Sequence, residues 1–491
     1  MKIFFSTILV LQLSFSYSQI DFKTVDADKI SRSFITDKFL GYQDGIYYFQ
    51  YLIIKNIIQF DRKKTQGLGV VMFDKDLKEI RRFEISGKEK KENLLATYFK
   101  DGKLHLIASH DNKENKIINH YSFDNSGNRI DAKELLVTDE DSNIDVDFSL
   151  DSSKILIVNK FDPNTKNENC KLDACVIDKD GNLQWKKSSS LGNSKEFDFK
   201  AFKINNEGNL YVIMQALSKN DAYSYNLFNL NKNGSHTTKL VTNGYIGIVK
   251  MYETEDGCYL TGFNYNLKKG IHVNPFLVRI NDKKTELIVP NEAINEDHLA
   301  PLIKNKFYKD KDGWSGYSSL VHAWKNDKLE HRIVWEASYL SIEKVGGIQY
   351  KYNECKHYFM FIYDANETLK DIKICPKELA TDADYFIYPV QSFVQNDIMY
   401  AVFNEQENNI NLASIDKWKN KGDQIPILRR FKPDGSIKDI KLNKNLSNQG
   451  VIPNASGLTS EGNLIFYFGE FKFSKIKDFK IGLININNFE K

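Results

Sequence analysis

The chain has 491 residues, 41% of them hydrophobic, and 68 Lys and Arg against 65 Asp and Glu give it a formal net charge of +3. Because the basic residues are dispersed among acidic ones, the charge pattern gives no reason to expect a nucleic acid or an anionic membrane as a partner. The sequence has nine Pro and no long Gly, Ser or Pro tract that would mark a linker. We therefore expect a single domain over residues 19–491.

The first 18 residues have the three parts of a signal peptide. Lys2 supplies a positive charge, residues 3–15 form a short apolar core, and Ser16 to Ser18 offer small residues before Gln19. We expect cleavage after Ser18 and an exported protein, periplasmic or extracellular. The apolar stretch is shorter than the roughly 20 residues that a membrane-spanning helix needs, so we predict no membrane span.

A polar turn followed by an apolar strand recurs through the chain. Each turn combines Asp, Asn, Glu or Gln with Gly or a second polar residue and leads into a run such as LHLIAS or ILIVN. Such turns favour hairpins, because Gly and Asn tolerate the positive φ that tight turns require. The eight copies lie at residues 43–45, 101–103, 151–154, 207–209, 256–257, 326–328, 396–397 and 461–463.

A second turn type follows each copy of the first. Here an apolar strand runs into an Asp or Asn turn and out into another strand, as in HYSFDNSGNRI and CVIDKDGNLQW. The eight copies begin at Val70, His120, Cys175, Asn226, Phe276, Tyr358, Leu428 and Lys480. Two hairpins in each unit give four antiparallel strands, so the sequence predicts an all-β repeat. Only residues 291–305 have the pattern of a short helix.

Repeated units of four antiparallel strands resemble the broad class of secreted, bacterial-type β-propellers, and the likeness extends over nearly all of residues 19–491. No WD40, kelch or sialidase signature is present. The resemblance implies about eight blades, with seven as the alternative because the sixth unit is long. The last unit ends after its third strand, and residues 20–25 alternate apolar and polar side chains. We therefore predict that this N-terminal strand closes the last blade.

The five Cys of an exported chain are expected mostly to form disulfides. Cys355 and Cys375 lie at equal distances from residue 365, so a hairpin symmetric about that residue would place them opposite each other. Cys170 and Cys175 enclose four residues and could close a small loop. We predict these two disulfides, and a buried thiol for Cys258.

The densest acidic cluster lies at residues 138–151 and contains Asp139, Glu140, Asp141, Asp145, Asp147 and Asp151. Carboxylates bind Ca²⁺ when roughly six to eight oxygens converge. Because Ile144, Val146 and Phe148 alternate with acidic residues, the simpler interpretation is a strand with one apolar face. We predict no cofactor, with calcium as the alternative.

Three histidines, His105, His110 and His120, fall within one unit. His105 and His110 are five residues apart on one predicted strand and so point to opposite faces, which argues against a shared metal. We expect each of the three to be solvent-facing or satisfied in the core. The sequence contains no nucleophile elbow, zinc-protease motif or Walker-type loop, and whether the protein is an enzyme stays open.

Residues 314–339 contain three of the five Trp in the chain. Aromatic side chains bind sugars and peptides and are enriched at interaction hot spots. We predict a ligand-binding site at Trp314, Tyr317, His322, Trp324 and Trp335. The alternative interpretation is aromatic packing between neighbouring blades.

Three functions fit these patterns: a binding scaffold for a protein, peptide or glycan, a hydrolase acting on glycans or lactones at the central channel, and a structural component of the envelope. We favour the first, as a monomer, because no catalytic constellation is visible. A fold of this kind does not by itself imply a function. Three or more carboxylates or histidines converging on the channel would favour the hydrolase.

Overall fold

The computed structural model describes most of the chain outside its N-terminus. It describes residues 23–26, 34–54, 65–85, 92–112, 115–139, 143–160, 170–192, 197–217, 223–242, 244–266, 268–269, 271–281, 284–291, 293–298, 300, 317–345, 348–381, 391–407, 410, 424–442, 449–472 and 475–490. Of the residues singled out above, 1–22, Glu140, Asp141, 292, 299, 301–305 and Trp314 lie outside these ranges, and only the backbone is described for 23–26, Asp139, Cys170, Tyr317 and Cys355.

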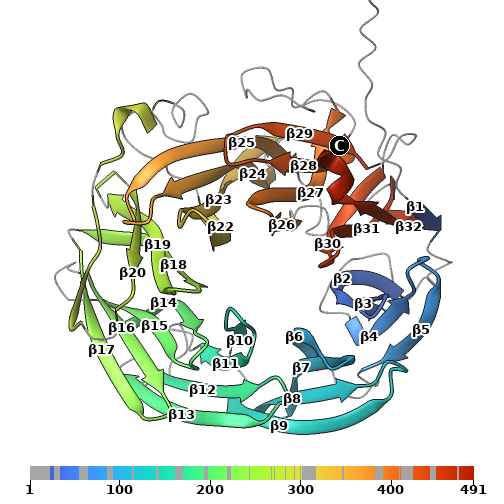
Figure 1. Cartoon of the computed structure of the whole chain (residues 1–491), viewed down its shortest axis with the longest axis horizontal. Coiled ribbons are helices and arrows are strands. Elements are labelled where there is room, and N and C mark those ends of the chain that lie inside the picture. Colours follow the sequence, from blue (N-terminus) through green and yellow to red (C-terminus); the bar gives the residue numbers. More distant parts are fainter. Residues whose placement is uncertain are drawn as a thin grey trace, which may run out of the picture.

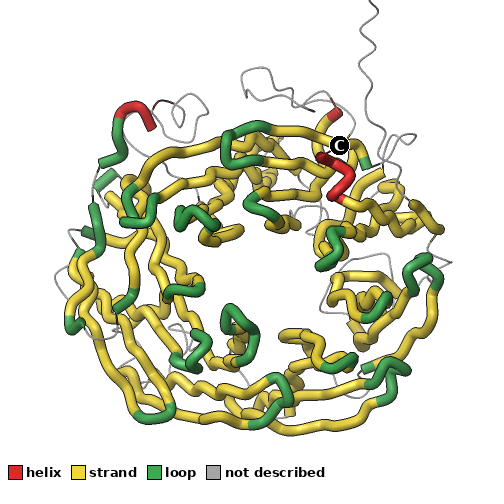
Figure 2. Tube along the Cα trace, in the orientation of Figure 1, coloured by secondary structure: helices red, strands yellow, loops and turns green. Residues whose placement is uncertain are grey.

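Eight small sheets stand in a ring about a common axis, in the order of the sequence (Figure 1). Strands make up most of the described chain, and helix is confined to a few short segments (Figure 2). Consecutive strands within each sheet pair antiparallel. The protein is therefore an all-β, eight-bladed β-propeller, as predicted, and the alternative of seven blades is excluded.

Each blade is one sheet, numbered along the chain. Blade 1 contains β2 (Phe34–Gln43), β3 (Ile46–Ile54), β4 (Thr65–Phe73) and β5 (Glu79–Glu84). Blade 2 contains β6 (Glu92–Lys100), β7 (Lys103–Asn112), β8 (Asn115–Phe123) and β9 (Arg129–Asp139). Blade 3 contains β10 (Asn143–Phe148), β11 (Lys154–Lys160), β12 (Cys170–Asp178) and β13 (Leu183–Gly192). Blade 4 contains β14 (Phe197–Ile204), β15 (Leu210–Leu217), β16 (Tyr223–Asn231), β17 (Gly234–Val241) and β21 (Glu286–Ile288).

The second half of the ring follows the same plan. Blade 5 contains β18 (Tyr245–Thr254), β19 (Gly257–Asn266) and β20 (Ile271–Arg279). Blade 6 contains β22 (Tyr317–Lys325), β23 (His331–Val345), β24 (Ile348–Tyr363) and β25 (Leu369–Thr381). Blade 7 contains β26 (Gln391–Gln395), β27 (Ile398–Gln406), β28 (Gln424–Phe431) and β29 (Ile437–Lys441). Blade 8 contains β30 (Gln449–Leu458), β31 (Asn463–Lys472), β32 (Lys475–Asn485) and β1 (Lys23–Asp26).

Turn chemistry explains the repeated Asp residues. The Asp178 carboxylate accepts hydrogen bonds from the backbone N–H groups of Asp180 (2.8 Å) and Asn182 (2.9 Å), and Gly181 has a φ of 72°. The Asp124 carboxylate makes the same pair of bonds in blade 2. An Asp that closes its own turn, followed by a Gly at positive φ, sets each of these hairpins.

The ring is closed by the N-terminal strand. β1 pairs antiparallel with β32, in the register Lys23 opposite Leu483 to Asp26 opposite Lys480, and is the outermost strand of blade 8. The predicted strand exchange is therefore confirmed. Closing the last blade with the first strand covers an edge that would otherwise be exposed.

Blade 5 differs from the prediction, because it has only three strands in the described part of the chain. The sequence pattern beginning at Phe276 predicted a hairpin whose second strand would complete blade 5. Instead β21 pairs parallel with β17 of blade 4, with Leu240 opposite Leu287. The Val289 N–H extends this ladder by donating to the carbonyl of Val241 at 2.9 Å. The fourth strand of blade 5 has thus become the fifth strand of blade 4.

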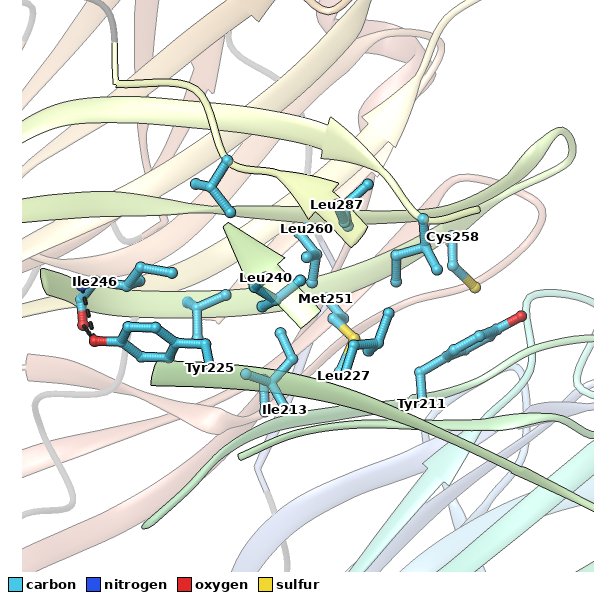
Figure 3. Close-up of a cluster of buried hydrophobic side chains, with 14 of the residues drawn as sticks. Tyr211, Ile213, Tyr225, Leu227, Leu240, Ile246, Met251, Cys258, Leu260 and Leu287 are labelled. Carbon is cyan, nitrogen blue, oxygen red and sulfur yellow. Dashed lines mark hydrogen bonds between the residues drawn. The ribbon is translucent and has the colours of Figure 1, made fainter. Parts of the chain in front are cut away.

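The buried hydrophobic side chains form eight clusters, one at each interface between neighbouring blades. Figure 3 shows the cluster between blades 4 and 5, to which β21 contributes Leu287 beside Leu240 and Leu260. The Tyr225 hydroxyl is hydrogen-bonded to the backbone of Ile246 in the same cluster. Stability is therefore distributed around the ring, as expected of a repeat in which each unit contacts mainly its neighbours.

Neither predicted disulfide is present, since Cys175 and Cys375 are buried free thiols. The hairpin of β24 and β25 is centred on residue 366 and not on 365, since Tyr363 pairs with Leu369, and bulges shift the register further. Cys375 therefore lies opposite Tyr358, while Cys355 lies opposite Leu379. Cys170 and Cys175 lie on the same extended strand. Five residues of such a strand span roughly 16 Å, whereas disulfide Cα atoms lie within about 7 Å of each other. Burial raises the pKa of the Cys175 thiol to about 11 and that of Cys375 to about 12. Cys258 is buried, as predicted.

The helix predicted within residues 291–305 is present as a short segment at residues 296–298. Across the described ranges, no helix combines the length and the apolar character needed to cross a membrane.

Candidate functional site

The predicted aromatic site is dispersed over contacts between blades. The His322 Nε2 lies 2.9 Å from the Ser392 hydroxyl, and the Trp324 indole N–H donates to the Asp397 carboxylate at 2.8 Å, so both side chains join blade 6 to blade 7. Trp335 is 1% exposed and its ring meets Phe263 of blade 5 edge to face, with centroids 5.2 Å apart. These three side chains therefore pack between neighbouring blades, as the alternative interpretation expected.

Among the described acidic residues of the 138–151 cluster, Asp147 makes a structural contact between two blades. The Asp147 carboxylate accepts hydrogen bonds from the Lys203 ammonium at 2.9 Å and from the Ile204 N–H at 2.9 Å. These bonds join blade 3 to blade 4. Within the described ranges, no group of three His, Cys, Asp or Glu side chains is placed to hold a metal ion.

The three histidines of blade 2 are buried, and two of them form one cluster. His105 Nδ1 lies 3.0 Å from His120 Nε2, and the Tyr98 hydroxyl lies 2.9 Å from the same nitrogen. His110 lies apart, with its Nδ1 3.3 Å from the Asn119 side-chain amide. Burial, and then the neighbouring His105, lower the pKa of His120 to about 4. All three histidines thus lie in the core and not in solvent, but the buried Nδ1 of His120 has no hydrogen-bond partner among the described residues.

This cluster predicts acid sensitivity. An unfolded histidine titrates near pH 6.5, so between pH 6.5 and about 4 the unfolded chain binds a proton at His120 that the folded chain does not. Stability should therefore fall as the pH is lowered through this window, by about 3 kcal/mol for His120 alone. Urea unfolding at a series of pH values measures the effect. The His120→Gln variant should show a flatter dependence, while His236→Gln, which changes an exposed side chain, should keep the wild-type slope. A midpoint that does not change between pH 7 and pH 4 would contradict the prediction.

A hollow of about 970 Å³ lies where blades 4, 5 and 6 meet. Its walls are the turns at 205–207 and 254–257, the segment 278–288 apart from its undescribed residues, and Glu367 of blade 6. Tyr211, Cys258 and Leu287 belong both to this lining and to the hydrophobic cluster of Figure 3. The hollow lies beside the position that a fourth strand of blade 5 would occupy. The departure of β21 to blade 4 therefore explains its presence.

Acidic side chains outnumber basic ones in this hollow, which we call the acidic hollow. Its carboxylates come from Glu207, Glu253, Glu255, Asp256, Glu286 and Glu367, and its cations from Arg279 and Lys284. A cleft lined by one sign of charge concentrates the field between low-dielectric walls. The acidic hollow therefore attracts cations.

Some of these carboxylates hold the walls together. Glu253 accepts backbone N–H groups from Leu150 (2.7 Å) and Asn206 (2.8 Å), and so links blade 5 to the turns of blades 3 and 4. Asp256 accepts from the Lys325 ammonium at 2.6 Å. Burial opposes the charge of Asp256, but the hydrogen bonds from Lys325, Thr254 and Tyr259 hold its pKa well below the usual range.

Other carboxylates of the acidic hollow are open to solvent. Glu255 and Glu286 are exposed, and neither forms an ion pair with another described residue. They stand on different elements, Glu255 in the turn before β19 and Glu286 at the start of β21. These two side chains are the ones best able to contact a bound ligand.

The sequence did not indicate this site. Its carboxylates come from three separate turns and from the strands β18 and β21, so no spacing along the chain brings them together. Of its lining residues, those at 207 and 256–257 were singled out only as parts of hairpin turns, and Cys258 only as a buried thiol. One feature is related to the hollow: the segment that forms β21 has only three strand residues, which would make a weak fourth strand for blade 5.

No family model matches the sequence, and no curated protein matches it. Among solved structures, the WD40 domain of SCAP from fission yeast is similar at a TM-score of 0.36 and 7% identity, over 94% of this chain and 98% of that one. A puromycin hydrolase is similar at a TM-score of 0.37 and 11% identity, over 76% of this chain and 51% of that one. A prolyl endopeptidase is similar at a TM-score of 0.35 and 10% identity, over 82% of this chain and 46% of that one. This chain thus spans about half the length of these two enzymes, and likenesses at this level carry no argument about function.

Proposed function

We propose that this protein is a non-catalytic binding scaffold, and that its ligand is a cationic segment of a protein or peptide held in the acidic hollow. The observation that carries the proposal is the excess of six carboxylates over two cations around a hollow of about 970 Å³. Lys and Arg side chains pair with carboxylates through charge-assisted hydrogen bonds, which are stronger than neutral ones.

The lining favours a peptide over a glycan. Sugars commonly stack on exposed aromatic rings. The acidic hollow has one aromatic side chain among its described lining residues, Tyr211, and it is only 4% exposed. A ligand that binds here must therefore gain its affinity from charge and from hydrogen bonds.

Neutralising the two exposed carboxylates tests the proposal. We expect the double variant Glu255→Gln and Glu286→Gln to bind a fluorescein-labelled, acetylated and amidated VKVKVKV peptide about tenfold more weakly than the wild type, since exposed charge pairs contribute up to about 1 kcal/mol each. Fluorescence anisotropy measures the affinity. The difference between the two proteins should shrink in high salt, because ions screen exposed charges.

A matched control keeps the same change of net charge. Glu84→Gln and Glu134→Gln neutralise two exposed carboxylates on β5 and β9, in blades 1 and 2. This variant should bind the peptide as the wild type does. Equal weakening in both variants would mean that only the overall charge matters, and no binding to the wild type would overturn the proposal.

A hydrolase acting on glycans or lactones is the second candidate, and one observation favours it. Burial raises the pKa of Glu367 while Asp256 keeps a pKa well below the usual range, and both line the acidic hollow. Carboxyl groups whose pKa values are driven apart are typical of acid and base pairs. We expect no turnover of a glycan and lactone panel. If the wild type turns over a member of the panel and the Glu367→Gln variant does not, the protein is a hydrolase and the proposed binding scaffold is overturned.

The partner's location follows from the signal peptide predicted at residues 1–18, which supports a periplasmic or extracellular ligand. Calcium at the 138–151 cluster and a monomeric state remain predictions from the sequence. Isothermal titration with Ca²⁺ and sedimentation of the purified protein test them.

A further inference from the structure

A cation of the chain itself already occupies part of the acidic hollow. Arg279, the last residue of β20, is exposed and lines the hollow. Its guanidinium donates a hydrogen bond to the backbone carbonyl of Asp256, in the turn between β18 and β19. Arg279 therefore shows how the walls of the hollow receive a positively charged side chain.

The space that this guanidinium fills is kept clear by a glycine. A Cβ atom built on Gly257 would lie 3.4 Å from Arg279 Nε and 3.5 Å from its Nη2, which is already van der Waals contact. Any longer side chain at Gly257 would enter the space of the guanidinium. Gly257 also has a φ of 143°, a conformation that glycine adopts without steric cost.

An aromatic ring lies beside the same space. Tyr259 is paired directly opposite Arg279 across β19 and β20, and the guanidinium carbon is 6.0 Å from the centre of the Tyr259 ring. A cation over an aromatic face is attracted by the ring. The Tyr259 hydroxyl donates to the Asp256 carboxylate at 3.0 Å, which fixes the ring. We call the Asp256 carbonyl, Gly257 and the Tyr259 ring the guanidinium platform.

A carboxylate faces the platform from blade 6. Glu367 lies in the turn between β24 and β25, accepts the backbone N–H of Arg279 and lines the acidic hollow. Burial raises the pKa of Glu367, and the positive charge of Arg279 opposes this rise, so the guanidinium lies near this carboxylate. A hydrogen-bond acceptor, an aromatic face and a carboxylate are together suited to a guanidinium.

The guanidinium of Arg279 is held at the surface and not in the core. In blades 1 and 2 the corresponding positions of the third strand are Met72 and Ser122, which are buried and belong to blades with a fourth strand. In blade 5 the fourth strand has joined blade 4, and Arg279 is exposed. Its guanidinium can therefore leave the platform by rotation of the side chain, without any movement of the backbone.

From this arrangement we infer that the guanidinium platform is an arginine-binding subsite of the acidic hollow, that Arg279 fills it in the free protein, and that an Arg side chain of the ligand takes its place. The inference rests on the proposed function, and it narrows the cationic ligand to one that contains Arg. A planar guanidinium can contact the ring and donate to the carbonyl together, whereas a Lys ammonium is a point charge.

A tethered occupant weakens the binding of the ligand that it imitates. A side chain attached beside its site competes at a high effective concentration. If Arg279 fills the platform for about nine-tenths of the time, the apparent affinity for the ligand falls about tenfold. Removing the Arg279 guanidinium should therefore strengthen binding.

Arg279→Lys tests the inference with the net charge unchanged. The probe is an acetylated, amidated and fluorescein-labelled VRVRVRV peptide in anisotropy titrations. We expect the variant to bind this peptide about fivefold more tightly than the wild type, because an ammonium competes less well for the platform. Arg279→Met leaves the platform empty and also removes a like charge, so it should bind about twentyfold more tightly.

Lys284→Met is the matched control, because Lys284 is the other cation of the acidic hollow and is also exposed. This variant should bind VRVRVRV at most about fivefold more tightly, the effect of one exposed charge. The labelled VKVKVKV peptide should gain no more from Arg279→Met than from Lys284→Met, since an ammonium does not match the platform.

The outcomes separate this inference from the proposed function. If Lys284→Met strengthens the binding of VRVRVRV as much as Arg279→Met does, only the charge of the hollow matters, and the subsite is overturned while the binding scaffold stands. An Arg279→Lys variant that binds VRVRVRV as the wild type does would overturn the subsite too. If neither peptide binds the wild type, the proposed function fails and the inference fails with it.

The side-chain Nε–H signal of Arg279 reports the displacement directly. In an NMR spectrum of protein with isotope-labelled Arg, this signal is the one that Arg279→Lys removes. Saturating the wild type with unlabelled VRVRVRV should shift the signal, whereas a peptide of alternating Val and Glu should leave it in place. A signal that stays unchanged at saturation would mean that the ligand binds beside Arg279 and not in its place, which overturns the inference.

Discussion

A chain that starts at Ala27 should unfold at a clearly lower temperature than a chain that starts at Gln19. The shorter chain lacks β1, whose four residues pair with β32 and complete blade 8. If each backbone hydrogen bond contributes about 1 kcal/mol, the loss is on the order of 4 kcal/mol. Differential scanning calorimetry measures the shift.

The chain that starts at Gln19 is the matched control, because it lacks only the predicted signal peptide. The shorter chain should also associate, since β32 then presents an open edge, and light scattering would detect this. Identical transitions for the two chains would mean that the β1 pairing contributes nothing to closing the ring.

The second large effect is expected at Arg429, whose side chain is fully buried between blades 6 and 7. Its guanidinium donates to both carboxylate oxygens of Asp439, at 2.7 and 2.6 Å, and to the backbone carbonyl of Pro376. Glu405, also fully buried, lies 4.0 Å away. Burial opposes the charge of Arg429, but the adjacent Asp439 carboxylate holds its pKa above the usual value.

Arg429→Met should lower the free energy of unfolding by about 3–5 kcal/mol, because it leaves two buried carboxylates without their cation. Arg429→Lys should recover only part of this loss, since an ammonium cannot form the paired bonds to Asp439. Urea denaturation measures both. Adding Asp439→Asn to Arg429→Met removes one of the uncompensated charges and should restore stability in part. A double variant less stable than Arg429→Met would contradict this account.

Local chemistry made the blades predictable. Each hairpin is set by a few adjacent residues, such as Asp178 with Gly181, so the sequence alone indicates where the strands turn. The count of eight blades followed from these turns, and the closure by β1 followed from the missing strand of the last unit and the alternating residues 20–25. The same turns also explain why most apparent motifs have a structural role.

Contacts between distant residues were not predictable in this way. A turn centred on residue 366 and the bulges of β24 and β25 together place Cys375 away from Cys355, and nothing in the sequence marks a bulge. The parallel pairing of β21 with β17 depends on which neighbour it reaches. The acidic hollow depends both on that pairing and on residues from blades 4, 5 and 6. The aromatic residues at 314–339 stood out because they are close in sequence, although the described ones pack between blades.

The closure by β1 also sets the order of events during synthesis. β1 is made long before its partner β32. About 450 residues separate Asp26 from Lys480, so at translation rates of about 5–20 residues per second the first strand waits on the order of 20–90 seconds for its partner. During that time seven blades can form while the ring stays open. Closure of the ring is therefore a single event that cannot occur before β32 has been made.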